Sequence, residues 1–578
     1  MEIFIPKIQK NTTSYWQIII LSLSLILVSG CASSNYSVSL PGTSLRTGSV
    51  KLEKRYIWNP LLASDFILGY GVSEQGNLYQ FYKKHDFNPL WLSHGSLNNN
   101  SKELLKSLNT TWKEGLSGKN YNVEEIHEMI NELRGAQEMT PATMKKIMYL
   151  DIMFTNAYLE YAADLYIGKV NPDRLDSIWE ALPQSEDLMT ILDHALSKNQ
   201  VARSLEELKP DNRAYDMLTD KMEQYMEIKV QGGWIQPGYF PVLEYGDTSA
   251  NIIHVKKFFK ISGDLRDVDS LYMRSPWFDE ILTDAVMEFQ HRHGLYVDGV
   301  IGRNTLSSMN YSVDQRIDKI RANLERLRWL PDDLGEKYIL VNLPEYKLRY
   351  YENDKIASEM KIIIGEIENS TPVLKDTLQY IVFNPTWRLP RSIAVEEVLP
   401  KIKSDSTYLN RNKFSLLKGS YLSKDTIHPD SVDWTQIEKD NFPFYIVRKP
   451  GPANPLGRVK FLFPNYHAIY LHDTPATHMF NYRERHFSHG CIRLERPFEL
   501  ASLLLNGRMT EEEISEVVES KETQSVIVPD EILVHFIYQT AWVDEQKKIH
   551  FRDDIYYFDK MTLERLEKGK LALNSRLN

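Results

Sequence analysis

The segment HFSHGCIR (486–493) contains Cys491, one of only two cysteines in a chain of 578 residues. Upstream, the strand-like run AIYLHD (468–473) includes His472 near its end. A thiol has a pKa near about 8.5, so its attack on an amide needs a neighbouring base or cation that favours the thiolate. A strand that ends near His472 can face a loop that carries Cys491, and the backbone carbonyl of Asp473 can accept the second ring N–H. These residues predict a cysteine nucleophile with a histidine base.

The turn before Cys491 favours this chemistry over two alternatives. Gly490 is typical of a tight turn that presents the thiol, which a buried structural cysteine does not need. A structural zinc site favours paired ligands such as C-x2-C. His467 and His472 stand five positions apart on a strand-like run and therefore project to opposite faces. We expect backbone amides after Gly490, including that of Cys491, to line an oxyanion hole.

The same residues resemble the motif of the YkuD-type L,D-transpeptidases. The likeness consists of His472-Asp473, a spacer and the tetrapeptide SHGC (488–491), with similar flanks in NPTWRLPRSI (384–393). It implies that Cys491 is the nucleophile and that His472 is its base and later its acid. The resemblance also assigns the motif loop and oxyanion hole to Ser488, His489, Gly490, Arg493 and Asp473, and substrate contacts to Tyr470 and Trp387. Short members of the family carry Asn at the position of Arg493.

The resemblance implies a two-step acyl transfer that needs no metal and no cofactor. The thiolate would attack the amide after the diamino acid of a peptidoglycan tetrapeptide stem, expel D-Ala and form a thioester. The side-chain amine of a neighbouring stem would then take the acyl group and complete a 3-3 cross-link. Three alternatives stay open: transfer to water by an L,D-carboxypeptidase, transfer to a protein amine by an anchoring enzyme, and an inactive wall-binding lipoprotein.

The hydrophobic pattern predicts a multidomain α+β protein whose first half is helical. A scaffold domain is expected at 61–235, where the helical spacing of apolar residues is clearest at 144–168. A small three-helix unit at 240–311 resembles the peptidoglycan-binding domain, and a connecting helix follows at 312–335. The residues that carry this second resemblance are Phe289, Gln290, Gly294, Leu295, Asp298, Gly299, Gly302 and Thr305.

Strand-like runs from residue 336 onward predict a mainly β catalytic domain at 336–560. A charged insertion at about 392–440 interrupts these runs. The chain resembles the large, YcbB-like branch of the family, and this likeness implies that the insertion is a subdomain that caps the substrate. The closing segment, 532–559, predicts a pair of β-strands.

The N-terminus resembles a bacterial lipoprotein signal. Lys7 and Lys10 precede an apolar run at 18–28 that is too short to span a bilayer comfortably, and the run ends in VSGC (28–31). The likeness implies a signal peptide at 1–31, lipidation of Cys31, and export to the outer membrane facing the periplasm. Residues 32–60 are the expected flexible tether. Cys491 would then be the sole thiol of the mature protein in a compartment that favours disulfides.

Composition narrows the set of partners. The formal net charge of −10 gives no reason to expect nucleic acid, which requires concentrated Lys and Arg. The expected partners are donor and acceptor stem peptides of peptidoglycan, a membrane reached through the N-terminal lipid, and other cell-wall enzymes.

Overall fold

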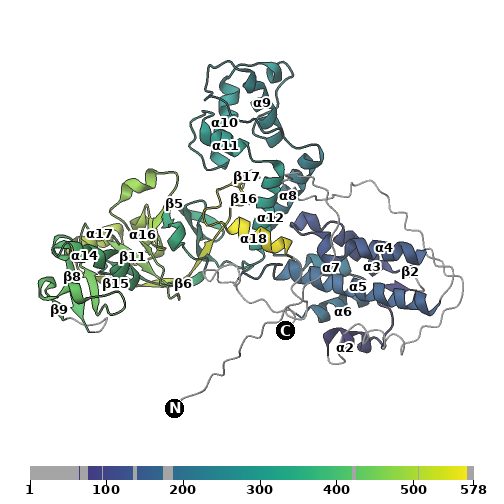
Figure 1. Cartoon of the computed structure of the whole chain (residues 1–578), viewed down its shortest axis with the longest axis horizontal. Coiled ribbons are helices and arrows are strands. Elements are labelled where there is room, and N and C mark those ends of the chain that lie inside the picture. The colour runs from purple at the N-terminus through teal and green to yellow at the C-terminus, as the bar shows by residue number, and fades with distance from the viewer. Residues whose placement is uncertain are drawn as a thin grey trace, which may run out of the picture. The chain divides into compact units, whose positions relative to one another are not determined.

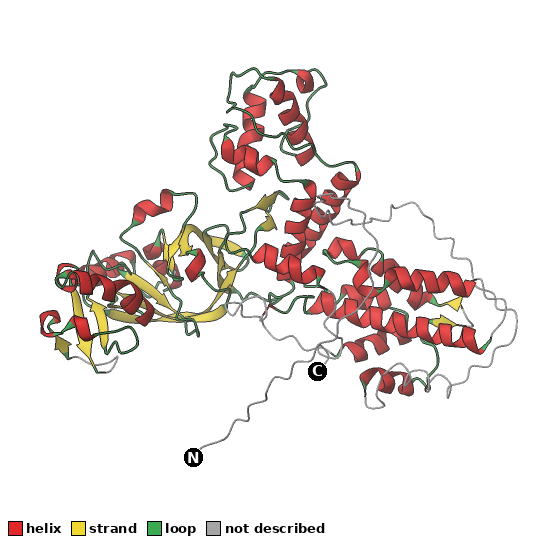
Figure 2. Ribbon diagram, viewed as in Figure 1, coloured by secondary structure: helices red, strands yellow, loops and turns green. Residues whose placement is uncertain are grey.

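The computed structural model describes residues 64, 76–93, 96–134, 140–172, 187–419, 425–505 and 507–568. The predicted signal peptide, Cys31 and the tether at 32–60 lie outside these residues. The described residues all belong to one compact unit, 50–578. Helices fill the first part of this unit and strands follow in the second (Figures 1 and 2). Within the described ranges, no helix is both long and apolar enough to cross a membrane.

The scaffold region is built around the long helix α5 (Pro141–Tyr166). Thr140 caps its N-terminus by accepting the backbone N–H of Thr143, and most of its side chains are buried. Buried Asp151 accepts the backbone N–H groups of Leu90 and Trp91 at 3.0 and 2.9 Å, which ties the preceding loop to the helix. The other elements are α2 (Asn77–Lys84), β1 (Leu92–Ser93), β2 (Ser96–Leu97), α3 (Asn99–Leu108), α4 (Val123–Arg134), α6 (Leu188–Lys198), α7 (Val201–Glu206) and α8 (Arg213–Val230).

A second helical unit contains α9 (Ala250–Ser262), α10 (Glu280–Arg292) and α11 (Arg303–Met309). Gln290 explains its sequence signature. The Gln290 amide nitrogen donates to Asp298 at 2.7 Å and to Thr305 at 3.2 Å, while its oxygen accepts the N–H of Gly299 at 2.9 Å. Gly299 adopts a φ of 72°, which glycine tolerates at no steric cost. One buried amide therefore fixes the turn between α10 and α11.

The connecting helix α12 (Val313–Leu327) begins with a capping box in which Ser312 and Gln315 satisfy each other's backbone N–H groups. Most of its charged residues are buried and paired. Lys319 and Arg326 donate to the carboxylate of Asp559 at 2.9 and 2.6 Å; this residue lies in α18 (Phe558–Glu567). Because an unpaired buried charge is costly, these pairs allow few alternative positions for the helix.

The predicted catalytic region contains a nine-stranded sheet in the order β13-β5-β14-β12-β11-β6-β15-β3-β4. An additional pairing of β4 with β5 closes eight of these strands on themselves around a large apolar core. Helices α16 (Pro497–Leu504) and α17 (Glu511–Ser520) follow β14. The strands are β3 (Lys337–Asn342), β4 (Lys347–Glu352), β5 (Lys355–Gly365), β6 (Lys375–Phe383), β11 (Val459–Leu462), β12 (Leu471–His472), β13 (His486–Ser488), β14 (Ile492–Leu494) and β15 (Gln524–Ile537).

An insertion between β6 and β11 has its own sheet and core. Its strand order is β7-β10-β8-β9, so the segment expected at 392–440 is flanked by two strands that pair with each other. Its core includes Val398, Ile402 and Leu409. The elements are β7 (Trp387–Arg388), α13 (Arg391–Ile393), the π-helical turn η6 (Ala394–Val398), α14 (Leu399–Ser404), α15 (Tyr408–Arg411), β8 (Phe414–Lys418), β9 (Thr426–Ile427) and β10 (Phe444–Arg448).

The expected multidomain α+β organisation is confirmed, and the closing segment contains the predicted pair of β-strands together with the end of a third strand. The apolar run that ends at Ile537 belongs to β15, which pairs with β6 and β3 in the main sheet. A separate short hairpin joins β16 (Ala541–Val543) to β17 (Ile549–Phe551). The sequence pattern did not separate β15 from β16, because a nearly continuous strand-like run gives no sign of where one strand ends or which partner each strand takes.

The ionic cluster at Asp559 yields a stability prediction. Asp559→Asn should lower the melting temperature by roughly 5–10 °C, because it leaves Lys319 and Arg326 buried without their counter-charge at a cost of about 3–5 kcal/mol. Thermal unfolding followed by circular dichroism measures the change.

The matched control is Asp314→Asn, which removes a more exposed ion pair between α12 and Lys229. Such a pair contributes at most about 1 kcal/mol. Equal changes in melting temperature for the two variants would show that the buried cluster has no special role.

Candidate active site

Cys491 lies in the turn between β13 and β14, and Ser488 holds that turn. Gly490 has a φ of 103°, a conformation that side-chain-bearing residues rarely adopt. The Ser488 hydroxyl donates to the carbonyl of Cys491 at 2.5 Å and accepts the N–H of Gly490 at 3.2 Å. Ser488 and Gly490 of the motif therefore fix the backbone conformation at Cys491.

A second layer of hydrogen bonds, which sequence reasoning missed, supports the same turn. The Thr371 hydroxyl donates to the carbonyl of Gly490 at 2.8 Å and accepts the N–H of Gly365 at 2.9 Å. Tyr556 donates to the carbonyl of Gly365 at 2.6 Å. A Cβ atom on Gly365 would lie 2.1 Å from the carbonyl oxygen of Asn369, so this close packing excludes a side chain there. These residues are distant in sequence from Cys491 and carry no local signal of their role.

His472 is placed beside this turn by the pairing of two short parallel strands. Leu471 lies opposite Ile492 and His472 opposite Arg493, and the N–H of Ile492 donates to the carbonyl of Tyr470 at 3.1 Å. This register places Tyr470 next to Cys491. The side chain of His472 comes from the same strand end as that of Tyr470, and their ring centroids are 5.7 Å apart.

The imidazole of His472 is oriented by a backbone carbonyl. Its Nδ1 lies 2.6 Å from the carbonyl oxygen of Asp473, which can only accept, so Nδ1 carries the proton and Nε2 keeps its lone pair. The Asp473 carboxylate instead accepts the N–H groups of Arg458 at 2.8 Å and Thr474 at 2.7 Å. Asp473 thus anchors the strand end, and its carbonyl, not its carboxylate, faces the histidine.

Burial sets the charge state of the candidate nucleophile and the candidate base. His472 is only 4% exposed, and burial lowers its pKa to about 3, with the charges of Arg493 and Lys460 acting in the same direction. Burial raises the pKa of the Cys491 thiol, against the effect of hydrogen bonds from Tyr470 and of the same two cations. At neutral pH the resting pair is therefore a neutral thiol and a neutral imidazole.

Two cations complete the surroundings of the thiol. Lys460 lies opposite His472 in the β11–β12 pair, with its Nζ 5.0 Å from the ring centroid of Tyr470. Sequence reasoning did not select it, although it lies in the strand-like run VKFLF (459–463). Arg493 has a buried Nε with no hydrogen-bond partner among the described residues, and its Nη1 is 3.8 Å from the sulfur of Met479.

Trp387 and His489 face the insertion. Trp387 packs against the insertion core, with its ring centroid 6.1 Å from that of Phe414. His489 points outward from the motif turn, and its Nε2 lies 2.7 Å from the carboxylate of Glu397 in the π-helical turn η6. The motif turn and the insertion are therefore in direct contact beside Cys491.

No metal-binding arrangement is found in the described part of the chain, where no three or more His, Cys, Asp or Glu side chains group in a way that could hold an ion. Two of the described histidines near the thiol have polar partners other than a metal: Nδ1 of His486 lies 2.9 Å from the Tyr346 hydroxyl, and Nε2 of His489 lies 2.7 Å from Glu397. The site as described consists of a thiol, an oriented imidazole and two cations.

Comparison with known proteins identifies three domains. Residues 76–222 match the family described as "Scaffold domain", residues 250–309 match "Putative peptidoglycan binding domain", and residues 336–518 match the YkuD family, described as "L,D-transpeptidase catalytic domain". The chain thus carries an L,D-transpeptidase catalytic domain together with the two other expected domains.

One curated relative is a Haemophilus influenzae protein named "Putative L,D-transpeptidase". It is 37% identical over 243 residues, which make up 42% of this chain and 48% of that protein. The chain therefore spans about half the length of the relative that it matches.

Two crystal structures of L,D-transpeptidases were also matched. The protein from Xylanimonas cellulosilytica is 12% identical, with a TM-score of 0.17 over 52% of this chain and 100% of that chain. The protein from Stackebrandtia nassauensis is 13% identical, with a TM-score of 0.20 over 51% of this chain and 94% of that chain.

The charge states yield a prediction for thiol reactivity. The alkylation rate of Cys491 by iodoacetamide should rise with pH and reach half its maximum above about 8.5, because burial raises the thiol pKa and neutral His472 supplies no imidazolium. Peptide-resolved mass spectrometry from about pH 6 to about pH 10 measures this. This method measures the alkylation of Cys31 separately from that of Cys491.

Arg493→Gln should move the midpoint to still higher pH, since the Arg493 charge lowers the thiol pKa. Arg496→Gln, an exposed position shortly after it in sequence, should leave the midpoint unchanged. A wild-type midpoint below about 7 would mean a preformed thiolate–imidazolium pair and would contradict the neutral resting state.

Proposed function

We propose that this chain, which carries an L,D-transpeptidase catalytic domain, joins peptidoglycan stem peptides through a thioester on Cys491. The observation that carries the proposal is the orientation of His472. Its Nδ1 is held by the Asp473 carbonyl at 2.6 Å, which leaves Nε2 able to accept a proton beside the strand that follows Cys491. A histidine locked in this tautomer is what a cysteine nucleophile needs from its base.

In the first step, the sulfur of Cys491 attacks the amide carbonyl that follows the diamino acid of a tetrapeptide stem. His472 accepts the thiol proton and then delivers it to the amine of the departing D-Ala. The C–N bond breaks, and the acyl group stays on the sulfur of Cys491 as a thioester. The amide of Gly490 already donates to Ser488, which leaves the amide of Cys491 as the candidate donor to the oxyanion. The positive charge of Lys460 stabilises the same developing negative charge.

In the second step, the side-chain amine of a neighbouring stem attacks the thioester. His472 accepts a proton from this amine, and the thiol of Cys491 is regained as the amide of a 3-3 cross-link forms. Water in place of the amine would give a carboxypeptidase, and a protein amine would give an anchoring enzyme. The contact of His489 with Glu397 supports a role for the insertion in shielding the thioester from water.

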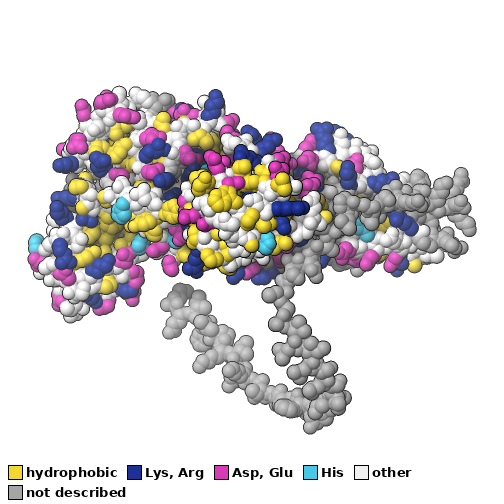
Figure 3. Space-filling view, turned by 90° about the horizontal axis from the view of Figure 1, so that it is seen from above, with side chains coloured by type: hydrophobic (Ala, Val, Ile, Leu, Met, Phe, Trp, Pro, Cys, Tyr) yellow, Lys and Arg dark blue, Asp and Glu magenta, His cyan; other side chains and the backbone are white. Residues whose placement is uncertain are grey.

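The peptidoglycan-binding domain offers exposed aromatic rings to the wall. Tyr245 and Trp277 are 67% and 46% exposed, and the bridge between Thr248 and Trp277 brings their segments together. This domain faces the viewer in Figure 3, where apolar side chains gather at the centre of the face. Aromatic faces of this kind suit contact with sugar rings and peptide stems.

We further propose that the mature protein is anchored through a lipid on Cys31 and faces the periplasm from the outer membrane. The support is the lipobox-like VSGC (28–31) after a short apolar run. This location would place the exposed aromatic rings and Cys491 in the compartment that contains peptidoglycan.

The central test compares muropeptides from strains that lack related enzymes. Cys491→Ala should abolish 3-3 cross-links, and His472→Ala should reduce their rate of formation by roughly 10²–10⁴-fold because the general base is lost. The measurement is chromatography with mass spectrometry of digested cell walls. His478→Ala, an exposed histidine in the next segment, should leave the cross-links intact.

Cross-links that persist in the Cys491→Ala strain would overturn the proposed transpeptidase chemistry. The absence of any cross-linking, hydrolytic or anchoring product from the purified wild-type protein would instead favour an inactive wall-binding lipoprotein.

The role of the insertion has its own test. Glu397→Gln should increase the hydrolysed product relative to the cross-linked product by up to about fivefold, because a partly exposed ion pair of this kind is worth at most about 1 kcal/mol. Product ratios from purified muropeptides are measured by mass spectrometry.

Glu396→Gln is the matched control. Glu396 is the neighbouring acid in the same π-helical turn, but it pairs with Lys439 inside the insertion and should not change the ratio. Equal effects of the two substitutions would contradict the assigned role of the Glu397 contact.

A further inference from the structure

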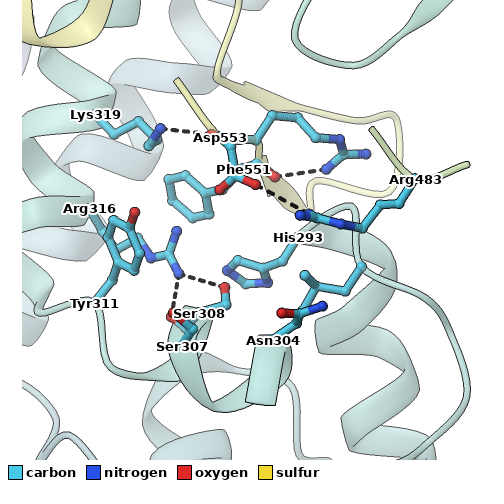
Figure 4. Close-up of a pocket in the computed structure, with 12 residues that line it drawn as sticks. His293, Asn304, Ser307, Ser308, Tyr311, Arg316, Lys319, Arg483, Phe551 and Asp553 are labelled. Atoms are coloured by element: carbon cyan, nitrogen blue, oxygen red, sulfur yellow. Dashed lines mark hydrogen bonds and ion pairs between the residues drawn. The ribbon is translucent and has the colours of Figure 1, made fainter. Parts of the chain in front are cut away.

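A cavity of about 110 Å³ lies at the junction of the peptidoglycan-binding domain, α12 and the segment around β17 (Figure 4). Its volume exceeds the roughly 10–15 Å³ needed for one water several-fold, so it can admit a small polar group. Arg316 and Arg552 line it from opposite segments, with Ser307 and Ser308 at the end of α11. Cys491 and His472 are not among its lining residues.

Arg316 is a buried cation whose hydrogen bonds and ring contacts are with neutral groups. It is 5% exposed, and its Nη2 donates to the carbonyl and hydroxyl oxygens of Ser308 at 2.7 and 3.1 Å. Its guanidinium packs against the rings of Tyr311 and Phe551, 4.7 and 4.6 Å from their centroids. No carboxylate among the described residues forms an ion pair with it. Burial lowers its pKa to about 10, so it remains charged at neutral pH.

Arg552 is a second guanidinium at the same cavity that forms no ion pair among the described residues. Its Nη1 donates to the carbonyls of Arg292 at 3.0 Å and Phe551 at 2.8 Å. Gly294, in the motif of the peptidoglycan-binding domain, leaves room for it: a Cβ there would lie 2.7 Å from Arg552 Cδ. The glycine also has a φ of 64°. A side chain at this position would displace Arg552 from the cavity wall.

The charge balance of the lining is strongly positive. Arg316, Arg552, Lys319 and Arg483 line the cavity, and Asp553 is the one carboxylate among the lining residues. Asp553 already pairs with Arg483 at 3.2 Å, and Lys319 pairs with Asp559 at 2.9 Å.

His293 contributes no positive charge to this balance. Its Nδ1 bonds to the carbonyl of Phe289 at 2.7 Å, and burial holds the pKa of the ring well below its usual value. Neither Arg316 nor Arg552 therefore has a carboxylate within ion-pair distance among the described residues. Asp553 and Glu345 act on them from farther away and already pair with Arg483 and Arg349. A buried cation such as Arg316 is normally matched by an anion.

We propose that this cavity binds an oxyanion, either a carboxylate or a phosphate group, between Arg316 and Arg552. Guanidinium groups are suited to both anions because their N–H donors match the geometry of the two oxygens. The anion would neutralise charge at a junction formed by the peptidoglycan-binding domain and the end of the catalytic region. The carboxylate of a peptidoglycan stem and free inorganic phosphate are the two sources with this chemistry. The site does not depend on Cys491, so its test uses binding and not activity.

The experiment measures thermal unfolding of the full chain with added inorganic phosphate, with acetate, or with a purified disaccharide-tetrapeptide. Sodium chloride at matched ionic strength is the reference for each. A ligand that binds only the folded state should give a saturable rise in melting temperature of about 2–5 °C. Arg316→Gln should abolish this rise. Arg303→Gln, an exposed arginine in α11 that does not line the cavity, should retain it.

A second variant covers the case in which Arg316→Gln does not fold. Ser307 is exposed at the cavity, so Ser307→Glu would supply a carboxylate from the protein itself. It should raise the melting temperature without ligand and remove the response to added anion.

A response that is confined to the disaccharide-tetrapeptide would support a stem carboxylate as the ligand, and a response to phosphate would support a free anion. The proposal is overturned if no anion changes the melting temperature, or if the response persists in the Ser307→Glu variant.

Discussion

The structure depends on the requirement that charges buried along α12 find partners. Lys319 and Arg326 pair with Asp559 at the C-terminal end of the catalytic region, and Arg328 donates to the carbonyl of Glu114 in the scaffold. Arg316 donates to Ser308 in the peptidoglycan-binding domain. One helix thus contacts all three domains through polar groups. A shift of α12 would leave several charges unpaired, and each broken buried pair costs about 3–5 kcal/mol.

The cost of burying a charge also determines the protonation of Cys491 and His472, the candidate nucleophile and base. The sheet places Cys491 and His472 in surroundings where burial opposes charge on either group. The cations Lys460 and Arg493 lower the thiol pKa, but they also disfavour an imidazolium at His472. The resting site therefore contains no thiolate–imidazolium ion pair. We expect negative charge to develop only when the thiol attacks a bound amide. A neutral resting thiol also reacts more slowly with oxidants than a thiolate does.

The sequence singled out Cys491 and His472 as the candidate reactive residues, but it did not identify the groups that hold them in place. The motif turn follows from local rules, because Gly490 needs a positive φ and Ser488 bonds within its own turn. The sequence did not indicate the supporting roles of Thr371 and Tyr556, because their contacts join segments far apart in the chain. Trp387 was selected as a substrate contact, and the structure places its ring against the insertion core. That core exists only after β7 pairs with β10.

By itself the sequence determined the domain order and the helical and strand periods, and it singled out Cys491 and His472 as the candidate nucleophile and base, since these depend on neighbouring residues and short spacings. Tertiary structure alone decided that β15 joins the main sheet, that Glu397 contacts His489, and that Arg316 and Arg552 share a cavity. It also decided the protonation states of Cys491 and His472. The physical reason is that burial and long-range pairing are properties of the folded chain, and a pKa depends on both.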